Sequence, residues 1–191
     1  MLGSFRRCGT ERNPRRRSVQ DGAVYSGVAI AVTVTLFADL RRLLPRGTDG
    51  PQRYTVREGA TVILPVYHPG ALLFVGDGHA LQGDGEPTGN GIETSLDVEF
   101  SVALRKKLDV NGPRVENAEY IISVGAQPEF SSDLNRALQM ATTDMVRWLT
   151  REYKIEPWAA HLLIAFQGKY DVITVAGCMG LRIPKKALPA N

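Results

Sequence analysis

Two segments of the chain alternate between apolar and other residues with the period of a β-strand. The first runs from Val28 to Leu36, and the second runs from Leu96 to Leu104, where Asp97 and Glu99 fall between apolar positions. Successive side chains of a strand point to opposite faces, so the second segment predicts an antiparallel strand with one face in the core and one in water. The first predicts a strand because its residues are mostly β-branched.

Shorter apolar segments extend the predicted sheet. We expect the segment after the Asn111-Gly112 turn to form a partner strand for Leu96–Leu104, because alternation resumes there. Ala71–Val75 is apolar throughout, which predicts a buried strand. The other predicted strands are Tyr54–Arg57, Thr61–Val66, Tyr120–Val124, Asp171–Val175 and Met179–Ile183.

Two helices are predicted near the C-terminus. The cluster Ser131-Ser132-Asp133 is typical of a helix start, and apolar residues then recur at steps of three and four from Leu134 to about Tyr153. Pro157 suits a first helical position, so residues 157–166 predict a second helix, and we expect Trp158 in the core. The fold class is therefore mainly β, with an antiparallel sandwich-like core and an α/β C-terminal portion containing two helices, α+β overall.

Residues 1–50 form an atypical arginine-rich segment with one predicted strand. They hold nine Arg and no Lys against four acidic residues, a charge of +5, so the rest of the chain carries 3 − 5 = −2. We therefore expect a boundary near residue 50, with residues 51–191 as one domain. Because the larger part has no basic excess, its charge argues against a nucleic-acid partner.

A membrane or targeting role for the first segment stays open at this point. Arg15-Arg16-Arg17 precedes the mostly apolar residues 23–38, an arrangement also found in signal and anchor segments. Sixteen residues are fewer than the roughly 20 that cross a bilayer. We therefore favour a strand and expect no membrane partner. Cys8 and Cys178 lie far apart without a CxxC pair, which suits a reducing, cytoplasmic compartment.

Functional groups concentrate in one glycine-rich segment. Residues 76–91 contain six glycines among Asp77, His79, Gln82, Asp84 and Glu86. Glycine lets a loop fold tightly around a small ligand, and the predicted strand before it would hold the loop in place. Solvated turn residues are the plainer explanation of each Asp-Gly pair. Five such groups within ten residues favour a metal or hydrolytic site instead.

The segment resembles a known family. The string ATVILPVYHPGALLFVGDGHALQGDGEPTGNGIET, residues 60–94, is similar to the signature of the acetamidase/formamidase family, and the similarity continues weakly to IPKKAL near the end. It covers roughly residues 55–188, which correspond to the C-terminal portion of that family, and residues 1–50 show no clear match. The resemblance implies a mainly β-sandwich fold, homo-oligomers, and metal-associated hydrolysis of small linear amides to a carboxylate and ammonia.

The same resemblance implies a set of site residues, to which we assign the following roles. A divalent metal such as zinc would be bound by Asp77 and His79, because imidazole and carboxylate groups suit such ions. Catalysis would fall to Glu86 as general base and to Asp84 as its orienting neighbour. Gln82 and Glu93 would bind the substrate amide. The alternative function is a non-catalytic metal- or ligand-binding or assembly module with the same fold.

Overall fold

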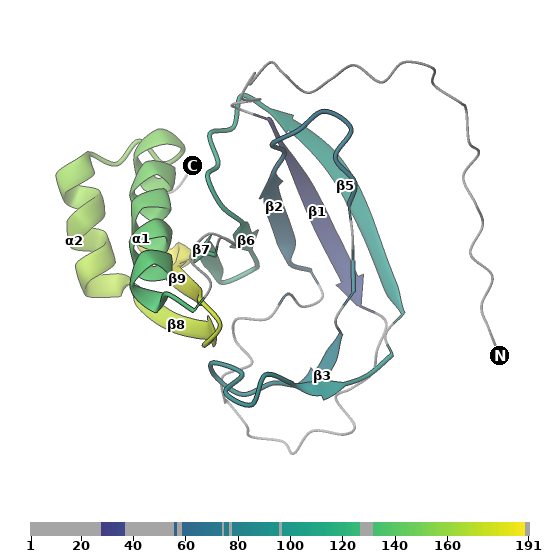
Figure 1. Cartoon of the computed structure of the whole chain (residues 1–191). Coiled ribbons are helices and arrows are strands. Elements are labelled where there is room, and N and C mark those ends of the chain that lie inside the picture. The colour runs from purple at the N-terminus through teal and green to yellow at the C-terminus, as the bar shows by residue number, and fades with distance from the viewer. Residues whose placement is uncertain are drawn as a thin grey trace, which may run out of the picture.

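A computed structural model describes residues 28–36, 56, 59–73, 75–76, 78–95, 97–126 and 132–189, leaving out the side chains of residues 28–36 and of Leu81. Within these residues the chain forms one seven-stranded sheet, a two-stranded sheet and two helices (Figure 1). The elements are β1 (Val28–Leu36), β2 (Thr61–Pro65), β3 (His79–Leu81), β4 (Ile92–Glu93), β5 (Val98–Lys106), β6 (Arg114–Glu116), β7 (Tyr120–Gly125), α1 (Leu134–Arg151), α2 (Pro157–Gln167), β8 (Lys169–Thr174), β9 (Cys178–Pro184) and a 3₁₀ turn (Lys185–Ala187).

The large sheet has the strand order β5-β1-β2-β6-β7-β9-β8, and every neighbouring pair is antiparallel. The alternating segment at residues 28–36 is a strand, as predicted, and it lies between β5 and β2. The predicted pairing of the Leu96–Leu104 segment with residues 120–124 is wrong. The long strand β5 pairs along its full length with β1, whereas β7 pairs with β6 and β9.

Both predicted helices form, and α1 covers one face of β7 and β9 (Figure 1). The Asp133 carboxylate caps α1 by accepting a hydrogen bond from the Arg136 backbone N–H, and Pro157 opens α2. The apolar face of α1 then packs on the sheet. The core at this contact consists of Ile121, Ala141, Met145, Trp148, Leu149, Ala160, Ile164, Leu181 and Ile183.

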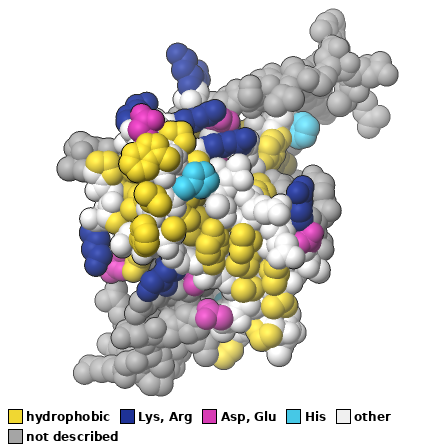
Figure 2. Space-filling view, turned by 90° about the vertical axis from the view of Figure 1, so that its left-hand side faces the viewer, with side chains coloured by type: hydrophobic (Ala, Val, Ile, Leu, Met, Phe, Trp, Pro, Cys, Tyr) yellow, Lys and Arg dark blue, Asp and Glu magenta, His cyan; other side chains and the backbone are white. Residues whose placement is uncertain are grey.

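The predicted burial of Trp158 is wrong, because its side chain is 68% exposed. It forms an exposed apolar stripe on α2 with Leu162 and Phe166, at helical spacing. Figure 2 views this side of the molecule and shows hydrophobic side chains gathered on the surface there. Pro157 starts the helix immediately before Trp158, and the opposite face of α2 carries the residues that contact the core.

A buried charged network joins α1 to β6. The Arg114 guanidinium is almost fully buried and donates two hydrogen bonds to the Asp144 carboxylate, at 2.7 and 3.0 Å. A third hydrogen bond, of 2.8 Å, goes to Glu152, and the guanidinium also stacks 4.6 Å above the Trp148 ring. Such bidentate pairing satisfies two charges that burial alone would strongly disfavour.

The segment before the glycine-rich loop is not the predicted buried strand. Leu72 is 77% exposed, Val75 is also exposed, and the described residues between 71 and 76 have no regular structure. The positive φ of Gly70, 71°, turns the chain directly after Pro69, which supplies no backbone donor for a sheet. Of the strand predicted at residues 54–57, only Val56 is described, and the other three positions lie outside the described residues.

The fold class is confirmed at the level of a mainly antiparallel β-sheet with two helices, α+β overall. The remaining predicted strands form as β2, β8 and β9. Among the described residues, no helix is both long and apolar enough to cross a membrane.

Candidate functional site

The glycine-rich segment forms a small hairpin rather than an open loop. Its arms are β3 and β4, which pair antiparallel and place His79 opposite Glu93. The Thr94 N–H donates to the Gly78 carbonyl at 3.0 Å and closes the open end of the hairpin. Two residues that are 14 positions apart in the sequence are thereby brought face to face.

The tip of the hairpin is attached to β8 through the backbone of Gly85. The Gly85 N–H donates to the Val172 carbonyl at 2.8 Å, and the Gly85 carbonyl accepts from the Val175 N–H at 2.7 Å. Gly85 has a φ of 77°, and a Cβ there would lie 3.2 Å from the Val175 side chain. Glycine is therefore favoured both by its backbone conformation and by the close approach to Val175.

Glu86, the next residue, has a left-handed backbone with a φ of 43°. This conformation is uncommon for a residue with a Cβ, and it is held by a turn in which the Glu86 N–H donates to the Gly83 carbonyl at 3.2 Å. Its side chain is half-buried, whereas that of Asp84 is exposed. The turn thus presents two carboxylates on the docked tip of the hairpin.

His79 lies between two other predicted site residues. Its Nδ1 is 2.9 Å from Gln82 Oε1, and its Nε2 is 3.0 Å from Glu93 Oε1. The imidazole is only 11% exposed, whereas the Glu93 side chain is 61% exposed. His79, Gln82 and Glu93 therefore form one hydrogen-bonded group at the solvent boundary.

The carboxamide of Gln82 determines which nitrogen of His79 carries a proton. Gln82 Nε2 donates to the Ile173 carbonyl of β8 at 3.2 Å, so its Oε1 faces the ring. An oxygen in that position accepts a hydrogen bond, which assigns a proton to Nδ1. Nε2 then either carries a second proton and pairs with Glu93, or presents a lone pair beside the carboxylate.

The other predicted site residues are not joined to this group. Among the described residues, neither the Asp84 nor the Glu86 side chain forms a hydrogen bond or ion pair. Asp77 lies outside the described residues. The anchoring role of Ile173 was not predicted, because its backbone carbonyl is 91 residues from Gln82 and carries no sequence signal.

The donor atoms of the described residues make up only part of a metal site. Within the described part of the chain, no group of three or more His, Cys, Asp or Glu side chains is placed to hold a metal ion. His79 Nε2 and Glu93 provide two suitable donors. The hydrogen bond between Nδ1 and Gln82 orients the ring, as hydrogen bonds to the other ring nitrogen do for histidines that bind metals. Further ligands would have to come from elsewhere.

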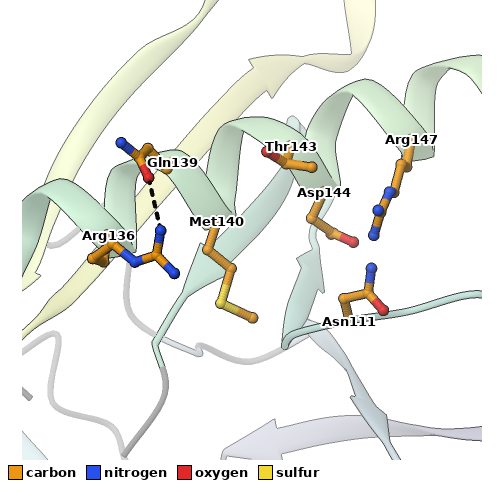
Figure 3. A pocket seen from close by; sticks show the side chains of 7 residues that line it. All are labelled: Asn111, Arg136, Gln139, Met140, Thr143, Asp144 and Arg147. Carbon is orange, nitrogen blue, oxygen red and sulfur yellow. Dashed lines mark hydrogen bonds between the residues drawn. The ribbon is translucent and has the colours of Figure 1, made fainter. Parts of the chain in front are cut away.

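A cavity of about 300 Å³ lies away from the hairpin, beside α1 (Figure 3). Arg136 and Gln139 line one part of it, joined by a 3.3 Å hydrogen bond, and Arg147 and Asn111 lie together at another. None of the predicted site residues lines this cavity, and the carboxylate of its one acidic residue, Asp144, is bonded to Arg114. It is therefore not part of the candidate site.

Comparison with known proteins identifies relatives. Residues 23–168 match the sequence model of the Acetamidase/Formamidase family, so the similarity begins well before residue 55, where the sequence alone suggested that it starts. No curated protein gave a match.

Three solved structures are similar to the chain. They are an acetamidase from Yersinia enterocolitica (34% identity, TM-score 0.64, covering 71% of this chain and 41% of that one), a predicted acetamidase/formamidase from Thermoanaerobacter tengcongensis (29%, 0.60, 68% and 42%) and an acetamidase from Bacillus halodurans (25%, 0.62, 69% and 44%). The matched region thus spans about two fifths of the length of each of these proteins.

Proposed function

The chain belongs to the acetamidase/formamidase family, and we propose that it hydrolyses small linear amides, of the formamide and acetamide type, to a carboxylate and ammonia. The site would be the β3–β4 hairpin. The observation that carries this proposal is the placement of His79 between Gln82 and Glu93, with the tip of the same hairpin presenting Asp84 and Glu86. Imidazole and carboxylate groups on one supported element are what proton transfer to and from an amide requires.

The proposed reaction adds water to the amide carbonyl and breaks the carbon–nitrogen bond. We assign Glu86 as the general base that takes a proton from the attacking water and returns it to the departing nitrogen. A new carbon–oxygen bond forms, the amide nitrogen leaves as ammonia, and the resulting carboxylic acid, which keeps the carbonyl oxygen, becomes the carboxylate by releasing the second proton of the water. Asp84, two residues away, would orient Glu86 and the water. The left-handed backbone at Glu86 supports this assignment, because such conformations are often retained at functional sites.

We also propose a divalent metal, with zinc as the first candidate. Asp77 and His79 would bind it, and the 3.0 Å approach of Glu93 to His79 Nε2 makes Glu93 a further ligand candidate beside its expected role in substrate binding. When bound, such an ion polarises a carbonyl and acidifies water. Gln82 is bonded to His79 and to Ile173, which supports a role in positioning the ring in addition to contact with the substrate amide.

Ammonia release from formamide and acetamide tests the activity, with each divalent metal added in turn and with a chelator. We expect Glu86→Gln to lower kcat at least about 100-fold, the usual contribution of a general base. The matched control is Glu119→Gln, an exposed glutamate in a turn outside the hairpin, which should keep full activity. Equal activity of the Glu86→Gln variant and the wild type would remove Glu86 from the mechanism.

The alternative function is a non-catalytic module that binds a metal or small ligand or serves assembly. It is favoured by the two-donor set among the described residues and by a match to about two fifths of each acetamidase. Isothermal titration with Zn²⁺, run beside the amide assay, separates the two functions. Metal binding without ammonia release supports the module, whereas release that stops with chelator supports the metal-dependent hydrolase.

We further propose that the chain works in the cytoplasm as a homo-oligomer, without nucleic-acid or membrane partners, and that its sheet is one layer of a sandwich. The exposed apolar residues of β5 support both assembly and a second layer, because apolar sheet faces are normally covered. Sedimentation velocity on the purified chain tests the oligomer. A monomer would contradict that part of the proposal and leave amide hydrolysis as it stands.

A further inference from the structure

The strand β5 has a free edge. It is the first strand in the order of the large sheet, and within the described residues no strand pairs with its outer side. It is nine residues long and contains no proline. Proteins usually protect such edges with bulges, prolines or inward charges, since unpaired backbone groups recruit another strand.

The side chains of β5 are exposed on both faces of the sheet. One face carries Val98, Phe100, Val102 and Leu104, which are 37 to 59% exposed. Contiguous apolar surface of this kind on a soluble protein marks an interaction site more often than a solvated face. The free edge therefore points to a partner that adds a strand, and the apolar stripe would then lie beside apolar side chains of the added strand.

The sequence of β5 is complementary to itself. When the strand is laid antiparallel against a second copy about its midpoint, Val102, all nine residues are paired. Glu99 then faces Arg105 of the second copy, and Arg105 faces Glu99, so that opposite charges meet at both ends. Phe100 faces Leu104 in the same way. Moving the centre by one residue in either direction leaves strand residues unpaired and replaces the two Glu99–Arg105 pairs by pairs that include a residue outside β5, Asp97 or Lys107.

The charges of Glu99 and Arg105 are not matched inside the described part of one chain. Their neighbours across β1 are Thr35 and Ala29, and neither charged side chain takes part in an ion pair among the described residues. A two-fold axis through the midpoint would therefore supply both residues with a partner at once, as expected for a self-complementary interface.

We propose that two copies of this chain associate through their β5 strands, antiparallel and centred on Val102, to form one continuous fourteen-stranded sheet across the dimer (two sheets of seven strands). The inference deepens the self-association proposed above and does not depend on amide hydrolysis. Because the strand is a surface element, its charged residues can be exchanged without disturbing the core.

A charge exchange tests the interface. Glu99→Arg alone places like charges opposite each other at two positions, and Arg105→Glu alone does the same, so each should weaken the dimer about tenfold or more. The double variant Glu99→Arg/Arg105→Glu restores both pairs and should recover the wild-type dissociation constant. Sedimentation velocity over a range of protein concentrations measures each constant, and circular dichroism checks that each variant is folded.

Disulfide trapping tests the register. In a background of Cys8→Ser and Cys178→Ser, Val102→Cys places two thiols directly opposite each other, where Cβ atoms are about 4.5–5.5 Å apart, so mild oxidation should give a covalent dimer. The matched control is Phe100→Cys. Its two thiols would lie four residues out of register, roughly 13 Å apart, and should not join.

The possible outcomes distinguish the β5 interface from the more general proposal, on which it rests, that the chain self-associates. A wild-type chain that is monomeric up to about 100 μM overturns both the self-association and the β5 interface. A dimer in which the double variant is as weak as the single ones retains self-association and overturns β5 as the interface. Cross-linking of Phe100→Cys as fast as Val102→Cys overturns the register.

Discussion

The two halves of the large sheet differ in how their strands are covered. In the helix-covered half, made of β6, β7, β9 and β8 with α1 and α2, the strand β7 has five buried residues out of six. In the β5 half, made of β5, β1 and β2, all nine residues of β5 are exposed. Both β5 and β7 come from alternating segments of the sequence. The burial of a strand is thus decided by what packs on each of its faces, and not by the alternation of apolar residues in its sequence.

The candidate site belongs to the helix-covered half through its contacts. The β3–β4 hairpin is bonded to β8 at Gly85 and Gln82, and its arms lead by sequence to β2 and β5. The site is therefore held in place by hydrogen bonds to the half of the sheet that packs on its own core. If the comparison holds, substitutions in the helix-covered half should cost far more stability than matched substitutions elsewhere.

The largest effect is expected at Gly125, where β7 meets α1. A Cβ at this position would overlap the Ala137 carbonyl of the helix, so Gly125→Ala must push α1 off the sheet. We expect a loss of more than about 4 kcal/mol in the free energy of unfolding, measured by urea denaturation. Gly76→Ala is the control, because no atom of the described residues beyond its chain neighbours lies within 4 Å of its Cβ position, and it should change stability by less than about 0.5 kcal/mol. Equal losses of stability for the two variants would contradict the proposed difference between the two halves of the sheet.

Asp144→Ala should cost about 3–5 kcal/mol, because it leaves the Arg114 guanidinium buried without its bidentate partner. The matched acid is Asp97, which is exposed beside β5, and Asp97→Ala should lie within about 0.5 kcal/mol of the wild type. Thermal unfolding followed by circular dichroism compares the two. A mild effect at Asp144 would mean that the network contributes little to the core.

Substituting one leucine in each half removes the same atoms from both, so the two losses of stability can be compared directly. Leu149 in α1 is fully buried, so Leu149→Ala should cost about 2–4 kcal/mol, whereas Leu104→Ala on β5, where the side chain is 59% exposed, should cost less than about 1 kcal/mol. Urea denaturation at low protein concentration makes the measurement on the dissociated chain. If the loss of stability caused by Leu104→Ala increases with protein concentration, Leu104 instead contributes to the proposed dimer.

The smallest effect concerns pH. Burial raises the pKa of Glu152 above 4.5, although the Arg114 guanidinium opposes the shift. A carboxyl whose pKa is higher in the folded state favours folding when protonated, so its contribution is present below pH 4.5 and is lost as the pH rises through the raised pKa. Glu152→Gln should therefore flatten the dependence of stability on pH in this window, by less than about 1 kcal/mol. An unchanged slope would assign the dependence to other groups.

Local features of the sequence predicted the elements but not their neighbours. Each predicted element is specified by residues that lie close together in the sequence. Asp133 and Pro157 mark the starts of the two helices, and the alternation at residues 28–36 marks a strand. The strand predicted at Ala71–Val75 failed, since an apolar run forms a strand only where another strand or layer is available to it. The same dependence on neighbouring elements explains Trp158. Its helix was predicted correctly, but the prediction that its side chain is buried was wrong, because no described element covers that face of α2.

The candidate site divides in the same way. The glycines and functional groups of residues 76–91 identified the segment and its family resemblance, and the match of residues 23–168 to the family agrees with it. The sequence did not show that β4 would place Glu93 opposite His79, or that β8 would hold Gln82. The contact between Gln82 and Ile173 spans 91 positions. It uses a backbone carbonyl, a group that every residue possesses, so no sequence pattern marks it.

Periodicity, capping and glycine content act over short distances, and they were sufficient to predict both helices, six of the nine described strands and the segment in which the functional side chains concentrate. Only the tertiary structure decided which strands pair, which apolar faces are covered, and how His79 is oriented between Gln82 and Glu93. Those outcomes depend on long-range packing, in which an element is buried or exposed according to the partner that reaches it.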